Sequence, residues 1–260
     1  MSVASDKDIF RLDGKLVLVT GASSGLGRHF ARRLASAGAR VALAARRTEL
    51  LEHIVADIVS TGGQAFAVHL DVTDSTSVRD CFDGIAAQAG VPDVVVSNAG
   101  LTVTKPILEQ DESDWDRVID TNLKGCWLVG TEAARRMKAE SKGGSLINVA
   151  SILGERVAGG VAPYAISKAA VIQATKAMAL ELARYGIRVN ALLPGYLVTD
   201  LNRDFLNSEA GQRLCARIPS RRFGELTDLD GPLLLLASDA GRAMSGATLA
   251  VDGAHLVSSL

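Results

Sequence analysis

The chain has 260 residues, of which 48% are hydrophobic and 4% aromatic, and its 28 basic and 29 acidic residues leave a formal net charge of −1. This balance argues against nucleic acid or an anionic membrane as a partner. The three cysteines are scattered and fit no metal-ligand spacing, no signal-peptide pattern is present, and no apolar run approaches the about 18 residues that cross a bilayer. We expect a cytoplasmic protein that holds no metal and has no membrane partner.

Short apolar runs alternate with segments of helical periodicity along the whole chain. Runs that are apolar throughout are typical of strands buried on both faces of a parallel sheet. Strands are predicted at residues 15–20, 40–45, 64–70, 91–97, 145–150, 187–193 and 247–251. Helices are predicted from the end of a glycine-rich turn to residue 37, and at residues 48–60, 75–89, 113–139, 164–185 and 227–237.

The repeated strand–helix order predicts one α/β domain over residues 1–260. Alternating units form a parallel sheet with right-handed crossovers and helices on both faces, so the expected fold is a doubly wound (Rossmann) sheet of about seven strands. Residues 1–13 are expected to be a loose lead-in, and the polar, amphipathic residues 196–225 a substrate lid. Ligands of such sheets bind beyond the carboxyl ends of the strands, where we expect the active site.

A glycine-rich turn, Gly21 to Gly27, joins the first predicted strand to the first predicted helix. Its N–H groups and the helix N-terminus can face a pyrophosphate. A glycine cluster alone is equally consistent with a tight turn, but its place at the front of a strand–helix unit favours a cofactor. The cofactor contacts predicted in this turn are Gly21, Ser23, Ser24, Gly25, Leu26 and Gly27.

An acid/base group is predicted between residues 151 and 168. Tyr164 and Lys168 are four residues apart at the start of a helix, so their side chains share one face. An ammonium beside a phenol lowers its pKa from about 10. Ser151 ends a strand, where its hydroxyl can hold a carbonyl oxygen. From these residues alone, a surface pair on a helix and a cap at a strand end remain open alternatives.

Taken together, the motifs resemble the short-chain dehydrogenase/reductase family. They occur in the family's order and approximate spacing from about residue 14 to residue 253, with Ser97 at a position where the family commonly has Asn. The ending, residues 245–253, is similar to the branch that contains carbonyl reductases and β-ketoacyl carrier-protein reductases. The matching motifs are Thr20–Gly27, Asn98–Gly100, Asn122, Ser151, Tyr164 with Lys168, and Pro194–Gly195.

The resemblance implies four catalytic residues. Tyr164 exchanges a proton with the substrate oxygen, Ser151 holds and polarises the carbonyl, and Lys168 lowers the pKa of the tyrosine and binds the nicotinamide ribose. Asn122, in the middle of a helix, holds a water in a proton relay. The further cofactor contacts implied are Asp71, Val72, Asn98, Ala99, Gly100, Tyr164, Lys168, Pro194, Gly195, Val198 and Thr199. The family's packing of two long helices implies a homotetramer.

The end of the second strand indicates which dinucleotide is bound. An acidic residue there would bind the adenosine ribose and repel a 2′-phosphate, but the strand ends at Ala45 and Arg46 follows. A guanidinium suits a phosphate, so we predict NADP(H), held by Arg46 and less strongly by Arg47. Solvated arginines at a helix start, with NAD(H) as cofactor, are the alternative.

The predicted activity is hydride transfer between NADP(H) and a secondary alcohol/ketone pair, in the carbonyl-reducing direction. The alternatives are an NAD-dependent alcohol dehydrogenase of the same family, a non-catalytic dinucleotide-binding regulator, and a lyase or dehydratase on the same fold. The small-molecule substrate is expected between residues 101–104, 152–161 and 196–218. Glu155 and Arg156 can face either the substrate or solvent, of which solvent is favoured, and the four histidines, His255 included, are expected to lie outside the site as surface or packing residues.

Overall fold

The computed structural model describes residues 9–199 and 203–258. All seven strands pair in parallel in one sheet, in the order β3-β2-β1-β4-β5-β6-β7. The predicted doubly wound α/β fold is therefore confirmed. The strands are β1 Leu16–Thr20, β2 Arg40–Ala45, β3 Gln64–His69, β4 Val94–Ser97, β5 Gly144–Val149, β6 Ile187–Pro194 and β7 Thr248–Val251.

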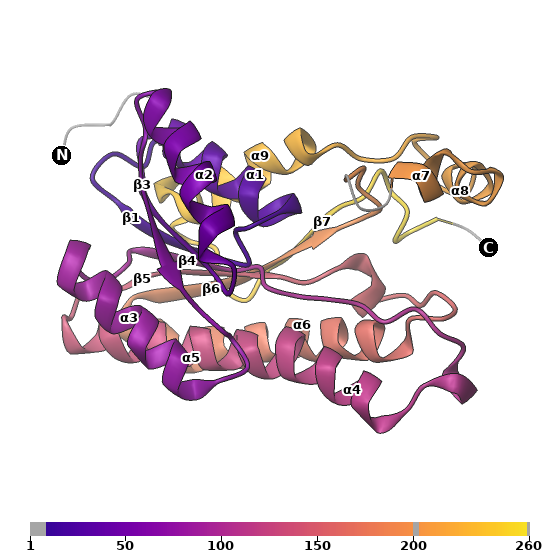
Figure 1. Ribbon diagram of the computed structural model, residues 1–260, viewed down its shortest axis with the longest axis horizontal. Helices are drawn as coiled ribbons and strands as arrows, with labels where there is room; N and C mark the ends of the chain where they lie inside the picture. The colour runs from indigo at the N-terminus through magenta and orange to yellow at the C-terminus, as the bar shows by residue number, and fades with distance from the viewer. Residues whose placement is uncertain (1–8, 200–202, 259–260) are drawn as a thin grey trace.

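Helices cover both faces of the sheet. The α-helices are α1 Gly25–Ser36, α2 Thr48–Ser60, α3 Ser75–Ala89, α4 Glu112–Ile119, α5 Gly125–Ala139, α6 Ala162–Leu182, α7 Arg203–Asn207, α8 Glu209–Cys215 and α9 Asp230–Ala237. Helices α1, α2 and α9 lie on one face, and α3, α5 and α6 on the other (Figure 1). Alternate residues of β1 enter opposite cores, Val17 packing with Phe30 and Leu18 with Phe82. This burial on both faces explains the uninterrupted apolar runs.

The order in which strands are added to the sheet reverses at β1, which pairs with β2 on one side and with β4 on the other. Crossovers leave this point in opposite directions, which opens a crevice beyond the carboxyl ends of the two strands. Thr20 and Asn98 stand at these ends. The Thr20 hydroxyl accepts hydrogen bonds from the N–H groups of Asn98 (3.0 Å) and Ala99 (3.1 Å). The two loops that border the crevice are thereby tied together.

Three predicted elements differ from the structure. The helix expected over residues 113–139 is divided by a π-helical turn, Asp120–Lys124, between α4 and α5. Strand β4 begins at Val94 rather than residue 91, because Pro92 lacks an N–H for the ladder. The helix expected from residue 227 begins as a 3₁₀ turn, and α9 follows with Pro232 in its first turn, where a missing N–H costs nothing.

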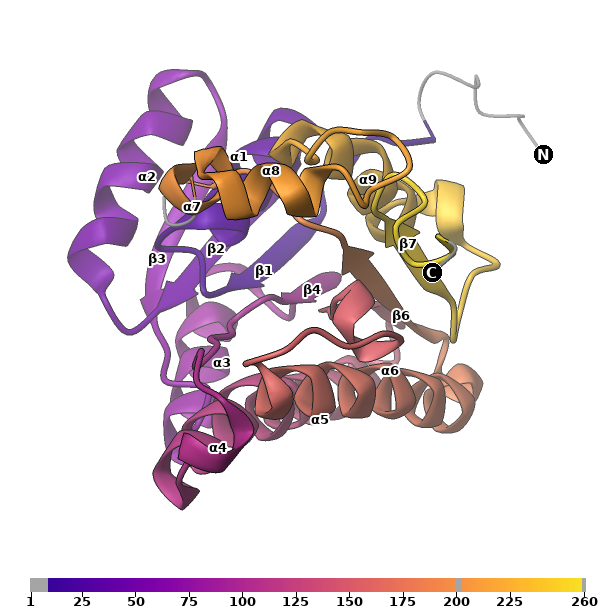
Figure 2. The same cartoon turned by 90° about the vertical axis from the view of Figure 1, so that its right-hand side faces the viewer.

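The two short helices α7 and α8 lie across the carboxyl edge of the sheet, on the side opposite α4 (Figures 1 and 2). They fall inside the expected lid, of which residues 200–202 are outside the described chain. Before the sheet, Leu12 is buried and its N–H donates to Ala37 (2.9 Å), so the end of the expected lead-in is docked on α1. Among the described residues, no helix is both long and apolar enough to cross a bilayer.

Candidate active site

The glycine-rich turn is shaped by close contacts with the chain after β4. Gly21 has φ +63°, and a Cβ there would lie 2.8 Å from the Ala99 Cα. A Cβ on Gly27 would overlap the Gly21 carbonyl oxygen and lie 2.6 Å from Asn98 Nδ2. Asn98 Nδ2 donates to the Thr20 carbonyl oxygen (3.0 Å) and so fixes the backbone where the turn begins. Glycine is therefore required for the strand-to-helix turn to fold this tightly.

The first turn of α1 is open to an anion. Ser24 is the N-cap residue in an extended conformation, and its side chain caps none of the backbone N–H groups. No acidic residue stands in the first turn of this helix. Uncapped N–H groups and the positive end of the helix dipole favour a phosphate at this place. The arrangement suits the pyrophosphate that the turn was predicted to hold.

Two arginines that follow β2 bring positive charge close to the glycine-rich turn. Ala45 is buried and leaves no carboxylate at the position that would repel a 2′-phosphate. Arg46 and Arg47 follow with exposed side chains, and Arg47 Nη2 donates to Ser23 Oγ (3.1 Å). The sequence favoured Arg46 for the 2′-phosphate, whereas the structure shows that Arg47 is the one bonded to the glycine-rich turn.

The remaining predicted cofactor residues line the same edge of the sheet. Asp71 follows β3, where burial raises its pKa but hydrogen bonds from Thr73 and the charge of Arg46 outweigh this and keep the pKa below its usual value. Asp71 is therefore ionised at neutral pH. Adjacent positions at the carboxyl ends of β3, β4 and β6 are taken by Val72, Asn98, Ala99, Gly100, Pro194, Gly195, Val198 and Thr199.

Ser151 and Tyr164 meet directly. Ser151 follows β5 and is buried, and its hydroxyl accepts the Leu153 N–H (3.1 Å) and hydrogen-bonds the Tyr164 side chain. Tyr164 stands in the first turn of α6, directly after Pro163. Burial raises the pKa of the Tyr164 phenol above its usual value, although the Ser151 hydrogen bond lowers it. Tyr164 is consequently protonated at neutral pH.

Lys168 is buried one helical turn further along α6. Its side chain is 5% exposed, and its Nζ donates to the Val149 carbonyl oxygen (2.7 Å) and lies 5.6 Å from the centre of the Tyr164 ring. Burial lowers the pKa of Lys168 to about 8. The net shift of the Tyr164 pKa is upward and not downward as expected beside Lys168, because desolvation of the phenol is the largest cause and the Ser151 hydrogen bond offsets it only in part.

Asn122 lies in the π-helical turn and closes the site from the side of α5. Its Oδ1 accepts the Leu101 N–H (2.8 Å), and its Nδ2 donates to the Leu101 carbonyl oxygen (2.9 Å) and to Ser167 Oγ (3.0 Å). A Cβ on Gly100 would lie 3.2 Å from Asn122 Oδ1 and 3.6 Å from Lys168 Nζ. Asn122 and Lys168 therefore border one small space beside Gly100.

Two contacts on the substrate side were not expected from the sequence. Arg156 does not point freely into solvent: its Nη1 donates to the His255 carbonyl oxygen and to Ser258 Oγ (3.2 Å), whereas Glu155 is exposed as expected. His255 is a buried packing residue, whose ring lies against Tyr196, two residues beyond β6. The contacts of Arg156 join residues about a hundred positions apart, so periodicity along the chain carries no signal for them.

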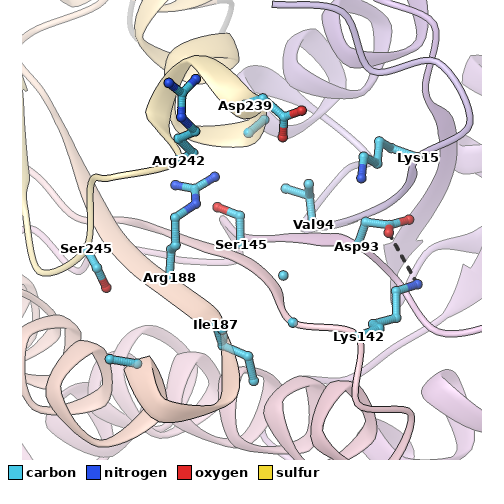
Figure 3. A pocket seen from close by; sticks show the side chains of 15 residues that line it. Lys15, Asp93, Val94, Lys142, Ser145, Ile187, Arg188, Asp239, Arg242 and Ser245 are labelled. Atoms are coloured by element: carbon cyan, nitrogen blue, oxygen red, sulfur yellow. Dashed lines mark ion pairs between the residues drawn. The ribbon is translucent and has the colours of Figure 1, made fainter. Parts of the chain in front are cut away.

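A separate hollow lies at the opposite, amino-terminal edge of the sheet (Figure 3). It measures about 400 Å³, and Lys15, Asp93 and Arg188 stand around it close to the starts of β1, β4 and β6. Lys142 and Asp93 form an ion pair there (3.3 Å). Because all the predicted catalytic residues stand at the carboxyl edge, this hollow is not the predicted substrate site.

A doubly wound sheet that gathers a glycine-rich turn and a Ser–Tyr–Lys group at one edge defines a dinucleotide-dependent oxidoreductase. A family model described as enoyl-(acyl carrier protein) reductase matches residues 21–254. A short-chain type dehydrogenase/reductase from Mycobacterium marinum is 38% identical, with a TM-score of 0.91 over 96% of this chain and 98% of its own. The chain therefore belongs to the short-chain dehydrogenase/reductase family, as its motifs predicted.

Several relatives in this family have named activities. Gluconate 5-dehydrogenase of Gluconobacter oxydans is 36% identical over 98% of this chain and 99% of its own. The 3-oxoacyl-[acyl-carrier-protein] reductase of Staphylococcus aureus is 39% identical over 92% of this chain and 97% of its own. A gluconate 5-dehydrogenase from Burkholderia cenocepacia, solved in complex with NADP and tartrate, is 37% identical with a TM-score of 0.93, covering 97% of this chain and 99% of its own.

Proposed function

We propose that this protein is an NADP(H)-dependent oxidoreductase that reduces a ketone to a secondary alcohol, with Tyr164 as the proton donor. The observation that carries the proposal is the placement of the half-buried Tyr164 phenol in the first turn of α6, where it is hydrogen-bonded to Ser151 and its ring centre lies 5.6 Å from Lys168 Nζ; desolvation holds its pKa above the usual value. A protonated acid is what carbonyl reduction requires at neutral pH. Alcohol oxidation would instead require the phenolate, which burial disfavours.

The geometry supports the following roles. Ser151 and Tyr164 donate hydrogen bonds to the substrate carbonyl oxygen and stabilise the charge that develops on it. Bound NADPH supplies the hydride that forms the new C–H bond. As the C=O π bond breaks, the Tyr164 proton passes to the oxygen, leaving a phenolate and an alcohol. The Lys168 ammonium, 5.6 Å from the ring centre, stabilises that phenolate, and Asn122 anchors the helix turn beside it.

The residues at the adenosine end fit NADP(H). Arg46 and Arg47 bring two guanidinium groups to the end of β2, and Ala45 leaves no carboxylate to repel the 2′-phosphate. A guanidinium fork binds phosphate in a bidentate manner. Two solved structures with the same fold hold NADP, the Burkholderia cenocepacia gluconate 5-dehydrogenase among them. NADP(H) is therefore the cofactor of this proposal.

Exposed apolar side chains on α5 and α6 support the homotetramer of this proposal. Trp127 on α5 and Ile166 on α6 are each 49% exposed, and Leu180 on α6 is 83% exposed. Apolar residues gathered on one face mark an association surface. Light scattering coupled to size-exclusion chromatography measures the mass directly. A mass of one chain at micromolar concentration would contradict the tetramer.

The proposed activity is tested by absorbance at 340 nm, which falls as NADPH is oxidised. A panel of ketones and alcohols is assayed with both dinucleotides, for the wild type and for Tyr164→Phe and Ser151→Ala. We expect turnover in the wild type and a loss of at least about a hundredfold in each variant. NADPH binding, followed by fluorescence, should persist in Tyr164→Phe. Binding without turnover in the wild type would instead indicate a regulator, and full activity of Tyr164→Phe would refute the mechanism.

A further inference from the structure

Tyr196 is held beside the catalytic group by the pairing of β5 with β6. The Ala150 N–H donates to the Leu192 carbonyl oxygen (2.8 Å), so Ser151 and the end of β6 are neighbours at the carboxyl edge. The chain then leaves β6 at Pro194 and reaches Tyr196 two residues later. Tyr196 therefore enters the site from the strand next to the one that delivers Ser151.

The backbone of Tyr196 is fixed on its outer side. The Gly224 N–H donates to the Tyr196 carbonyl oxygen (2.9 Å), and the Val198 N–H donates to the Gly224 carbonyl oxygen (2.9 Å). These two bonds form a small parallel bridge around Leu197, which is itself buried. The position of the Tyr196 side chain is consequently set by regular pairing and not by a free loop.

The ring of Tyr196 packs on His255, with ring centres 5.7 Å apart and planes inclined by 39°. His255 is 5% exposed, and its Nδ1 has no hydrogen-bond partner in the described chain. Its turn is closed by Asp252, whose carboxylate accepts the N–H groups of Ala254 (3.0 Å) and Leu256 (2.6 Å). A buried nitrogen without a partner is unfavourable, so other contacts must hold this turn against Tyr196.

Arg156 supplies such a contact. It lies on the loop after Ser151, and its guanidinium donates to the His255 carbonyl oxygen and to Ser258 Oγ. The Ser258 hydroxyl also donates to the His255 carbonyl oxygen (2.9 Å). Arg156 therefore binds two residues of one hydrogen-bonded turn. The loop after Ser151, the C-terminal turn and Tyr196 thus form one connected unit.

The hydroxyl of Tyr196 has no hydrogen-bond partner among the described residues. It makes no hydrogen bond to any residue within 9–199 or 203–258, although the side chain is half-buried. Burial raises the pKa of Tyr196 above its usual value even though the charge of Arg156 lowers it, so the phenol keeps its proton. Its proximity also contributes to the raised pKa of Tyr164. Two protonated phenols therefore lie near each other at the carboxyl edge of the sheet.

We propose that Tyr196 is a second substrate-binding residue, whose hydroxyl hydrogen-bonds an oxygen on the carbon next to the reacting carbonyl. The preferred substrate is then an α-hydroxy ketone, and the product a vicinal diol. Tyr164 donates to the ketone oxygen, while Tyr196 donates to or accepts from the adjacent hydroxyl. Arg156 and His255 are positioning residues that act through Tyr196. This inference rests on the proposed ketone reduction.

Matched ketones that differ by one hydroxyl test the assignment. The pairs are 3-hydroxybutan-2-one with butan-2-one, and 2-hydroxycyclohexanone with cyclohexanone, each assayed with NADPH at 340 nm. We expect kcat/KM in the wild type to be at least tenfold higher for the hydroxylated member of each pair. Tyr196→Phe should reduce this preference at least tenfold. Tyr185→Phe, at the far end of α6, is the matched control and should leave the preference unchanged.

Arg156 variants separate positioning from folding. Arg156→Met should raise KM for the hydroxy ketone several-fold with a smaller effect on kcat, and Arg156→Lys, which keeps a donor, should restore most of the loss. Urea unfolding of each variant reports whether the fold is retained. A lysine variant as impaired as the methionine variant, in a protein of wild-type stability, would contradict the positioning role.

The possible failures are distinguishable. Equal kcat/KM for both members of each pair, or a preference that survives Tyr196→Phe, overturns the role of Tyr196 and leaves ketone reduction standing. A Tyr196→Phe variant whose only defect is a raised KM for NADPH also overturns it, since the hydroxyl would then serve the cofactor. A wild-type protein that binds NADPH but reduces no ketone overturns the proposed function and this inference together.

Discussion

Removing the buried ammonium of Lys168 should stabilise the fold while it abolishes activity. Burial lowers the pKa of Lys168 from its ordinary 10.5 to about 8. Since one pKa unit corresponds to about 1.36 kcal/mol, holding the ammonium costs the folded protein about 3 kcal/mol at pH 7. Lys168→Met removes this cost but leaves the Val149 carbonyl without its donor, a loss of about 1 kcal/mol. We expect a net gain of about 2 kcal/mol in the free energy of unfolding.

The gain should depend on pH in a defined direction. The pKa of Lys168 is lower in the folded protein than in the unfolded chain, so the unfolded chain binds more protons between about pH 8 and pH 10.5. The cost in the wild type is full below pH 8 and falls through this interval, to about 1.4 kcal/mol at pH 9.5. The advantage of Lys168→Met should therefore nearly vanish by pH 9.5.

Urea unfolding followed by tryptophan fluorescence measures the free energy of unfolding and its dependence on pH. The wild type and Lys168→Met are compared at pH 7 and pH 9.5, at one protein concentration because association also stabilises the fold. Lys168→Leu, which is shorter but likewise apolar and uncharged, is a second probe of the same cost. A variant less stable than the wild type at pH 7, or a difference that does not change with pH, would refute the reasoning.

Three further predictions concern the cofactor and the catalytic turn. Arg46→Ala and Arg47→Ala should each weaken NADPH binding about tenfold or more, with a smaller effect on NADH, because a charge-assisted bond to the 2′-phosphate is worth about 1.5–3 kcal/mol; equal losses for both dinucleotides in steady-state kinetics would contradict the assignment. Gly27→Ala should lower the free energy of unfolding by about 2 kcal/mol because its Cβ has no room, whereas Gly231→Ala, in open space in α9, should raise it by up to about 1 kcal/mol; similar urea midpoints would be inconsistent with this. Asn122→Ala should lower kcat by about tenfold to a hundredfold, and an unaltered kcat would remove Asn122 from the catalytic group.

Much of the architecture is readable from the sequence because the determinants are local. Strands β1, β2 and β4 are buried on both faces and therefore appear as continuous apolar runs. The i, i+4 spacing of Tyr164 and Lys168 needs only the helical repeat to place both residues on one face. The glycine-rich turn is equally local, since a strand, a tight turn and a helix follow one another without interruption.

The features that the sequence did not predict depend on tertiary contacts. The pKa of Tyr164 follows from its depth of burial, which no spacing encodes, so the neighbouring lysine gave a misleading direction. Arg156 and His255 are 99 positions apart and are brought together by the tertiary fold alone. The π-helical turn is hidden because the apolar periodicity of residues 113–139 absorbs one extra residue without an obvious break.

That π-helical turn sets a limit on chain length at this point. Each residue of an α-helix advances the rotation by about 100°, so deleting one residue from Asp120–Lys124 would restore regular helix and turn everything beyond it by that angle. Trp127, now half-exposed on the outer side of α5, would swing toward the sheet, while buried Met137 would swing out. A surface loop absorbs an insertion or deletion locally. Here the same event would be propagated along a whole helix, so the spacing between Leu101 and α5 is expected to tolerate no gap.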